Sequence, residues 1–126
     1  MEFVESAGNP VPHFGLWEDA GLVNSKTSSS ALSYDTWYHM ALTYNGTTMK
    51  GYINGSEVVS KSVTFSSPHN HSNTNHYMVW GAGDVTNMGD GSFFNGSMNE
   101  IRLYADALSA TDILQNFNTN KADYGY

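Results

Sequence analysis

Three histidines close together in the sequence are the first residues that could carry chemistry. His69, His71 and His76 lie in one polar stretch, SSPHNHSNTNH, and imidazole is a good ligand for zinc or copper. No acid or cysteine stands beside them in the sequence to complete a coordination shell. The alternative is a polar loop that carries histidine by chance, so the sequence leaves transition-metal binding open.

A second candidate metal site follows in the stretch GDVTNMGDG. Asp84, Asn87 and Asp90 could offer side-chain oxygens to calcium, which prefers carboxylate and carbonyl ligands. The stretch lacks the D-x-D-x-D-G order of an EF-hand calcium loop. The alternative is a turn rich in glycine and aspartate, so calcium is an expectation and not a conclusion.

The acidic residues do not form a pattern suited to catalysis. Retaining glycoside hydrolysis needs two carboxylates about 5 Å apart. Glu2 and Glu5 are the closest glutamates in sequence, and Glu57 and Glu100 stand alone. The chain has no cysteine nucleophile, no G-x-S-x-G elbow and no H-E-x-x-H pair. We therefore expect a protein that is not an enzyme.

Aromatic residues are numerous enough to supply a sugar-binding platform. Such a platform needs a ring to stack on the apolar face of the sugar, with amide or hydroxyl groups beside it. Trp17 precedes two acids and Trp80 precedes a glycine-rich loop, so both are expected at the surface. An equal alternative is that these two tryptophans are themselves core residues. Trp37 and Tyr44 are interpreted as packing residues. The predicted ligand site comprises Trp17, Trp80, Asp84 and Asn87.

Composition narrows the class of partner. The chain has 126 residues, of which 40% are hydrophobic and 13% charged, which suits one globular domain. A net charge of −7 argues against nucleic acid and anionic membranes as partners. No apolar run is long enough for a membrane span, and the absence of cysteine excludes disulfides. The Asn/Ser/Thr/Gly-rich composition is typical of extracellular or virion-borne β proteins.

Most of the chain has the periodicity of antiparallel strands. From Trp37 to Tyr44, Tyr38 and its alternate neighbours form one apolar face, while Trp37, His39, Ala41 and Thr43 form the other. Asn45-Gly46 and Asn54-Gly55 are type I′ turn signals, so residues 37–60 should form a three-stranded meander. Further strands are expected at residues 2–5, 13–17, 21–24, 62–65 and 76–80.

The end of the chain reads as a strand that runs into a helix. Residues 93–104 are rich in strand formers, and Ser109 with Asp112 has the spacing of a capping box. The predicted helix covers residues 109–118 and packs through Leu108, Ile113, Leu114 and Phe117. The fold class is therefore all-β, an antiparallel β-sandwich with one short C-terminal helix.

Two blocks of sequence resemble a known family. They are DTWYHMALTYNGTTMKGYINGSEV, residues 35–58, and FFNGSMNEIRLYADALSATDI, residues 93–113. Both are similar to LamG-like jelly-roll domains of the concanavalin A-like lectin/glucanase superfamily. The resemblance implies a jelly roll over residues 1–126, glycan binding as the usual work, and often a structural calcium. The E-x-D-x-x-E motif of its catalytic members is not found here.

The chain departs from the family at its start. Family domains open with further strands ahead of the segment that matches residues 2–24, so we expect roughly the last two-thirds of such a domain. Uncovered sheet edges would then favour a homo-oligomer or a larger virion or surface assembly. The tail LQNFNTNKADYGY resembles LamG-like domains of phage structural proteins. We first expect the protein to be a capsid decoration or tail-associated protein with weak glycan binding. The alternative is that it is a stand-alone lectin-like module of a secreted protein. The expected location is the virion surface or the extracellular space.

Overall fold

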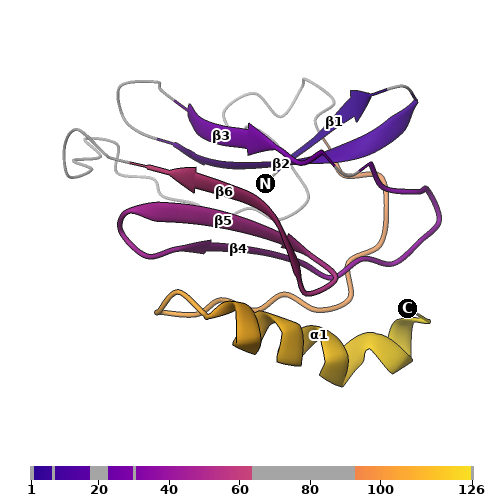
Figure 1. The fold of residues 1–126 in the computed structure, drawn as a ribbon. Helices are drawn as coiled ribbons and strands as arrows, with labels where there is room; N and C mark the ends of the chain where they lie inside the picture. Colours follow the sequence, from indigo (N-terminus) through magenta and orange to yellow (C-terminus); the bar gives the residue numbers. More distant parts are fainter. Residues whose placement is uncertain (1, 7, 18–22, 30, 64–92, 126) are drawn as a thin grey trace, which may run out of the picture. The chain divides into compact units, whose positions relative to one another are not determined.

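A computed structural model describes residues 2–6, 8–17, 23–29, 31–63 and 93–125. For residues 2–6, 17 and 23–27 it describes the backbone alone. The described residues fall into two compact units. Residues 93–103 belong to the smaller unit, and all the other described residues belong to the larger one. The larger unit carries every strand and helix discussed below (Figure 1).

The first sheet consists of three antiparallel strands in the order β1-β2-β3. β1 spans Glu2–Ser6, β2 spans Asn9–Trp17 and β3 spans Val23–Thr27. Gly8, at φ 77°, lies in the turn between β1 and β2, where its missing side chain allows a left-handed backbone. The three predicted strands in this region are confirmed, although β2 begins earlier and β3 ends later than the sequence suggests.

The second sheet is the predicted meander, in the order β4-β5-β6 (Figure 1). β4 spans Met40–Tyr44, β5 spans Thr48–Ile53 and β6 spans Ser56–Ser62. Asn54 and Gly55 both have positive φ, 49° and 77°, as a type I′ turn requires. The turn at Asn45 differs, because only Gly46 has positive φ there, and the Asn45 side chain instead accepts bonds from the backbone N–H groups of Thr47 and Thr48.

The core lies between these two sheets. Phe14 of β2 is fully buried and clusters with Met49, Ile53 and Val59 of the second sheet. The predicted apolar face of β4 contributes to the same core, since Met40, Leu42 and Tyr44 pack against it together with the preceding Tyr38. Two antiparallel sheets that share one core form a β-sandwich, which confirms the predicted fold class.

The one helix described, α1, spans Ala110–Tyr124. It begins where the sequence predicts, because Ser109 and Asp112 form the expected capping box, and it continues beyond the predicted end at residue 118. Ile113 is buried, whereas Leu114 is 45% exposed although it approaches Gly55 closely. Gly125 ends the helix in the left-handed conformation, φ 71°. Among the described residues, no helix has the length and apolarity needed to cross a membrane.

Helix α1 runs along the side of β4 opposite to the core. The residues of the second face predicted from the sequence alternation lie along the helix in order. The ring of Trp37 lies 5.5 Å from that of Tyr124, and the ring of His39 lies 6.0 Å from that of Phe117. Thr43 lines a groove with the first residues of the helix. The second face predicted for residues 37–43 is therefore the face beneath the helix.

The prediction of a strand over residues 93–104 is wrong in this structure. Phe93 makes a single β-bridge, and residues 94–104 belong to no strand. Several large apolar side chains in this stretch are exposed, with Phe93 at 60%, Ile101 at 46% and Leu103 at 72%. Strand propensity describes how side chains fit a pleated surface, and a strand also requires a continuous partner along its length. The expected strand at residues 76–80 lies outside the described residues.

Candidate functional site

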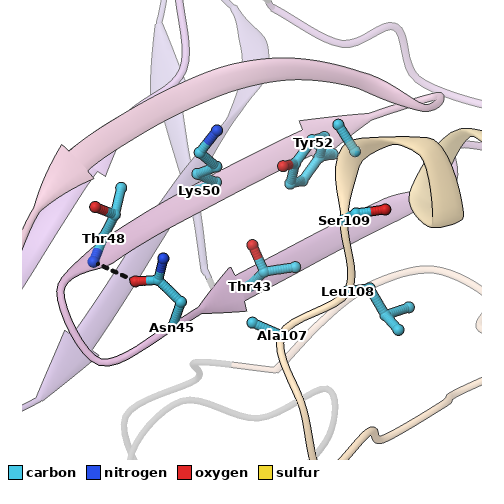
Figure 2. Close-up of a pocket in the computed structure, with 9 residues that line it drawn as sticks. Thr43, Asn45, Thr48, Lys50, Tyr52, Ala107, Leu108 and Ser109 are labelled. Carbon is cyan, nitrogen blue, oxygen red and sulfur yellow. Dashed lines mark hydrogen bonds between the residues drawn. The ribbon is translucent and has the colours of Figure 1, made fainter.

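A partly open groove lies on the outer face of the second sheet. Its cavity volume is about 330 Å³. Thr43 of β4 and Lys50 and Tyr52 of β5 form its floor, and the segment 107–110, which leads into α1, forms its wall (Figure 2). The lining residues are Thr43, Asn45, Thr48, Lys50, Tyr52, Ala107, Leu108, Ser109 and Ala110. We call this cavity the sheet–helix groove.

Strand alternation explains why these side chains share one face. Met49 and Ile53 of β5 belong to the core, so the residues between them, Lys50 and Tyr52, must point the other way. Thr43 lies directly opposite Lys50 in the β4–β5 pairing. The Asn45 side chain, by accepting from the Thr48 N–H at 2.8 Å, holds the hairpin that ends the groove (Figure 2).

Tyr52 is the least expected member of the groove. Its side chain is 1% exposed, yet its ring reaches the groove lining, and Figure 2 shows its hydroxyl on the same side of the sheet as Lys50 and Thr43. In the described part of the chain, this hydroxyl makes no hydrogen bond, and it lies at the groove. A ligand or a water molecule that enters the groove can therefore bond to it.

Charges around the groove are balanced. Lys50 donates to Glu57 Oε2 at 2.8 Å, and the hydrogen bond and charge of Glu57 raise the pKa of the Lys50 ammonium. At the start of α1, Asp112 accepts from the Ser109 hydroxyl at 2.6 Å and from its N–H at 3.0 Å, which lowers the pKa of the Asp112 carboxyl. These acids offset both the ammonium and the positive helix end. The groove therefore suits a neutral polar ligand better than an ion.

A second surface feature is the turn at residues 34–37, which we call the aromatic turn. Tyr34 is 61% exposed and Trp37 is 39% exposed. Trp37, which the sequence interpretation treats as a packing residue, packs its ring against Tyr124 of α1 and stays partly exposed. Tyr44, in contrast, does pack against the core as expected, with its hydroxyl donating to the Gly46 carbonyl at 2.7 Å.

The structure places few of the sequence-predicted site residues. The backbone of Trp17 ends β2, opposite Val23, and its side chain is not described. All the other predicted ligand and metal residues lie outside the described residues: Trp80, Asp84, Asn87, Asp90, His69, His71 and His76. Both metal sites and the Trp17/Trp80 platform therefore stay predictions.

Two of the described glutamates form separate ion pairs. Glu57 pairs with Lys50, and Glu100 accepts from the Arg102 Nε at 2.7 Å. Within the described ranges, no three side chains of His, Cys, Asp or Glu gather as a metal site would require. These ion pairs are at the surface, with about two fifths of each side chain exposed.

Sequence reasoning missed the sheet–helix groove because its two halves are far apart in the chain. Residues 43–52 supply the floor and residues 107–110 the wall. One signal was available, since the alternation of residues 37–43 put Thr43 on the face opposite the core. Nothing in the sequence indicated that the helix would cross that face. Tyr52 was missed for the same reason, because the sequence of a strand does not show which of its tyrosines lines a groove formed with a distant segment.

Comparison with known proteins adds a family. A laminin G-type family profile, described as the concanavalin A-like lectin/glucanases superfamily, matches residues 2–114. Among solved structures, the chain is similar to residues 221–444 of an S-layer domain-containing protein from Clostridium thermocellum, with 28% sequence identity and a TM-score of 0.54. The match covers 87% of this chain and 52% of that structure, so the chain spans about half the length of this relative. No curated protein matches.

Proposed function

The chain belongs to the concanavalin A-like lectin/glucanases superfamily, and from that premise we propose that it is a non-catalytic surface module that binds a neutral glycan in the sheet–helix groove. The superfamily contains both sugar-binding lectins and sugar-cleaving glucanases. The isolated carboxylates of the sequence favour binding over cleavage.

The observation that carries this proposal is the chemistry of the groove lining. Thr43, Thr48 and Tyr52 present hydroxyl groups, and Lys50 is neutralised by Glu57. A sugar offers many hydroxyl donors and acceptors without net charge, so it can satisfy these groups together. The Tyr52 hydroxyl is the most pre-organised of these groups, because burial of its ring fixes its direction before any ligand binds.

A surface location is supported by the solved relative, which is an S-layer domain-containing protein. We propose by analogy that this chain also works at a surface outside the cell. The exposed apolar side chains of Phe93, Ile101 and Leu103 support assembly with a second copy or with a larger surface structure, because such exposed groups often mark interaction sites. A calcium ion at residues 84–90 would be compatible with this role and stays a prediction.

A virion component is the second candidate function. Its support is the tail, residues 114–126, which resembles LamG-like domains of phage structural proteins. The solved relative favours a cellular surface instead. Static light scattering across a concentration series would test the assembly that both candidates share, and a strictly monomeric species would contradict it.

The groove can be tested with a pair of tyrosine-to-phenylalanine variants. The biotinylated chain would be loaded on streptavidin, so that four copies raise a weak affinity, and applied to an array of neutral oligosaccharides with and without calcium. Tyr52→Phe removes the groove hydroxyl and should reduce binding several-fold. Tyr104→Phe is the matched control, because its hydroxyl accepts from Asn116 Nδ2 at 3.3 Å and Tyr104 belongs neither to the groove lining nor to the aromatic turn. Equal binding by wild type and Tyr52→Phe would reject the groove as the site.

The non-catalytic part of the proposal has a separate test. Purified protein incubated with laminarin, β-glucan and agarose should release no reducing ends above a no-protein blank. Turnover that is measurable and disappears in a Glu100→Gln variant would contradict the proposal.

A further inference from the structure

The aromatic turn combines exposed rings with an exposed acid. Tyr34 and Trp37 flank Asp35, whose backbone has a left-handed φ of 54°. That conformation is uncommon for a residue with a side chain, although aspartate tolerates it better than most. An exposed acid thus lies within two residues of each aromatic residue in the chain, a combination that packing does not require because all three residues are exposed.

Hydrogen bonds on both sides hold the turn in place. The Ser33 N–H donates to the Tyr38 hydroxyl at 3.0 Å, and the Thr36 hydroxyl donates to the Tyr34 carbonyl at 3.1 Å. Just after the turn, the His39 N–H donates to Asn54 Oδ1 at 2.9 Å, and the Asn54 N–H donates back to the His39 carbonyl at 2.8 Å. Since Tyr38 also packs on the core, the turn is pre-organised and loses little freedom on binding.

Helix α1 fixes the orientation of the Trp37 ring. The ring meets Tyr124 at 5.5 Å between centroids with an angle of 47° between planes, a tilted contact that leaves 39% of the residue exposed. A ring supported on one side and open on the other is the arrangement that a stacking platform needs. The support comes from the last turn of the helix, whereas the sheet–helix groove lies at its first turn.

We propose that the aromatic turn is a stacking subsite for a pyranose whose ring substituents are all equatorial, such as a β-1,4-linked glucose unit. In such a sugar both ring faces carry only axial C–H bonds, so the face is flat and apolar and can lie on the indole of Trp37. The Asp35 carboxylate would accept hydrogen bonds from the equatorial hydroxyls at the ring edge. An axial hydroxyl would hold the sugar away from the indole. This inference rests on the proposed function and adds a sugar class to it.

The two sites are separate enough to act independently. They lie at opposite ends of a 15-residue helix, and a rise of 1.5 Å per residue separates them by about 20 Å. Effects of substitutions at such a distance should combine additively in binding free energy. Loss of one site therefore does not imply loss of the other, which allows the two proposals to fail separately.

The test measures binding of cellohexaose and of β-1,4-mannohexaose by calorimetry and by intrinsic tryptophan fluorescence. Wild type should prefer cellohexaose, because mannose carries an axial hydroxyl. Trp37→Ala should weaken cellohexaose binding at least about tenfold, the order expected when a stacked ring is removed. Asp35→Gly should weaken it several-fold with no loss of stability, because glycine adopts the left-handed conformation freely.

Fluorescence separates Trp37 from the other two tryptophans without depending on affinity alone. A change on adding cellohexaose should persist in Trp17→Phe and in Trp80→Phe and should be absent in Trp37→Phe. If Trp37→Ala unfolds the protein, Asp35→Gly and the fluorescence pattern still decide the matter.

Each contrary result has a distinct meaning. Wild-type binding by Trp37→Ala alongside weakened binding by Tyr52→Phe overturns the aromatic turn and leaves the groove. The reverse pattern overturns the groove and supports the turn. Equal affinity for the two hexaoses, or a fluorescence change that depends on Trp17 or Trp80, overturns the inference. A failure of wild type to bind either hexaose overturns it as well, whereas binding of another neutral glycan on the array would keep the proposed function.

Discussion

Replacing Gly51 with alanine tests the centre of the sandwich. Gly51 lies in β5 directly under Phe14 of β2. A Cβ atom at this position would stand 2.6 Å from Phe14 Cγ and 2.7 and 2.8 Å from the two Cδ atoms. Carbon atoms in contact normally lie about 3.5–4.0 Å apart. The methyl group can therefore be accommodated only if the phenylalanine ring or the strand moves.

The size of the effect follows from two opposing terms. Phe14 is fully buried, so its ring has no solvent side to move into, and overpacking of this kind costs about 1–3 kcal/mol. Glycine in a strand is itself less favourable than alanine by roughly 0.5–1 kcal/mol. The net expectation for Gly51→Ala is destabilisation by about 1–2 kcal/mol. With a urea m-value of roughly 1–3 kcal/mol/M, the midpoint should fall by about 0.5–1.5 M.

A double-mutant cycle shows whether Phe14 is the cause. Urea unfolding would be followed for Gly51→Ala, Phe14→Leu and the double variant. In the Phe14→Leu background the added methyl should cost almost nothing, a coupling of about 1 kcal/mol or more. Gly46→Ala is the control, because its penalty comes from a φ of 94° and no atom lies within 4 Å of its Cβ position, so it should not couple to Phe14. Wild-type stability of Gly51→Ala, or additivity with Phe14→Leu, would refute the packing of β2 on β5.

Three further predictions concern polar contacts. The pKa of Asp112 is lowered from an ordinary 3.8, so its bonds to Ser109 stabilise α1 above about pH 4 and are lost as the pH falls through the folded-state pKa. Ser109→Ala should therefore lower the free energy of unfolding by about 1 kcal/mol at pH 7. Asp112→Asn should flatten the acid limb of a pH–stability curve followed by circular dichroism. The pKa of Lys50 is raised above 10.5, so its pairing with Glu57 contributes to the free energy of unfolding below that pH and is lost as the pH rises through the folded-state pKa. Glu57→Gln should remove this alkaline dependence of stability. An unchanged slope of stability against pH in this variant would contradict the assignment. Asn54→Ala should destabilise by about 2 kcal/mol in thermal unfolding, because alanine tolerates φ 49° poorly and cannot accept from the His39 N–H, whereas Asn54→Gly should lose less since it keeps the backbone conformation.

The local signals of the sequence were sufficient for most of the fold. Asn54-Gly55 specified its turn, Ser109 with Asp112 specified the start of the helix, and alternation specified the core face of β4. Each of these depends on residues within a few positions of one another. Asn45-Gly46 shows the limit of such rules, because the Asn45 side chain captures the following N–H groups and replaces the expected turn type.

Predictions that depend on distant partners did less well. Residues 93–104 have the composition of a strand, but a strand needs a second chain segment along its length, and periodicity does not identify one. The predicted ligand site at Trp17 and Trp80 depends on their exposure and stays a prediction, because the side chain of Trp17 and the whole of Trp80 lie outside the described part of the chain. Exposure depends on what packs against a residue from elsewhere in the chain. Trp37 illustrates this, since its motif suggested packing and its contact with Tyr124 leaves it at the surface.

The outer face of residues 37–43 shows how local pattern and distant packing together produce a site. Alternation alone places Trp37, His39 and Thr43 on the same side of the chain. Helix α1 then meets this side at successive points, with Tyr124 at Trp37, Phe117 at His39 and its first turn at Thr43. Near Gly55, the side chains of Leu114 and Phe117 lie against the turn that joins β5 and β6. The groove lies at the first turn of the helix, and the partly exposed ring of Trp37 lies at its last turn. Both proposed sugar sites thus depend on the way in which one helix lies over the outer face of residues 37–43.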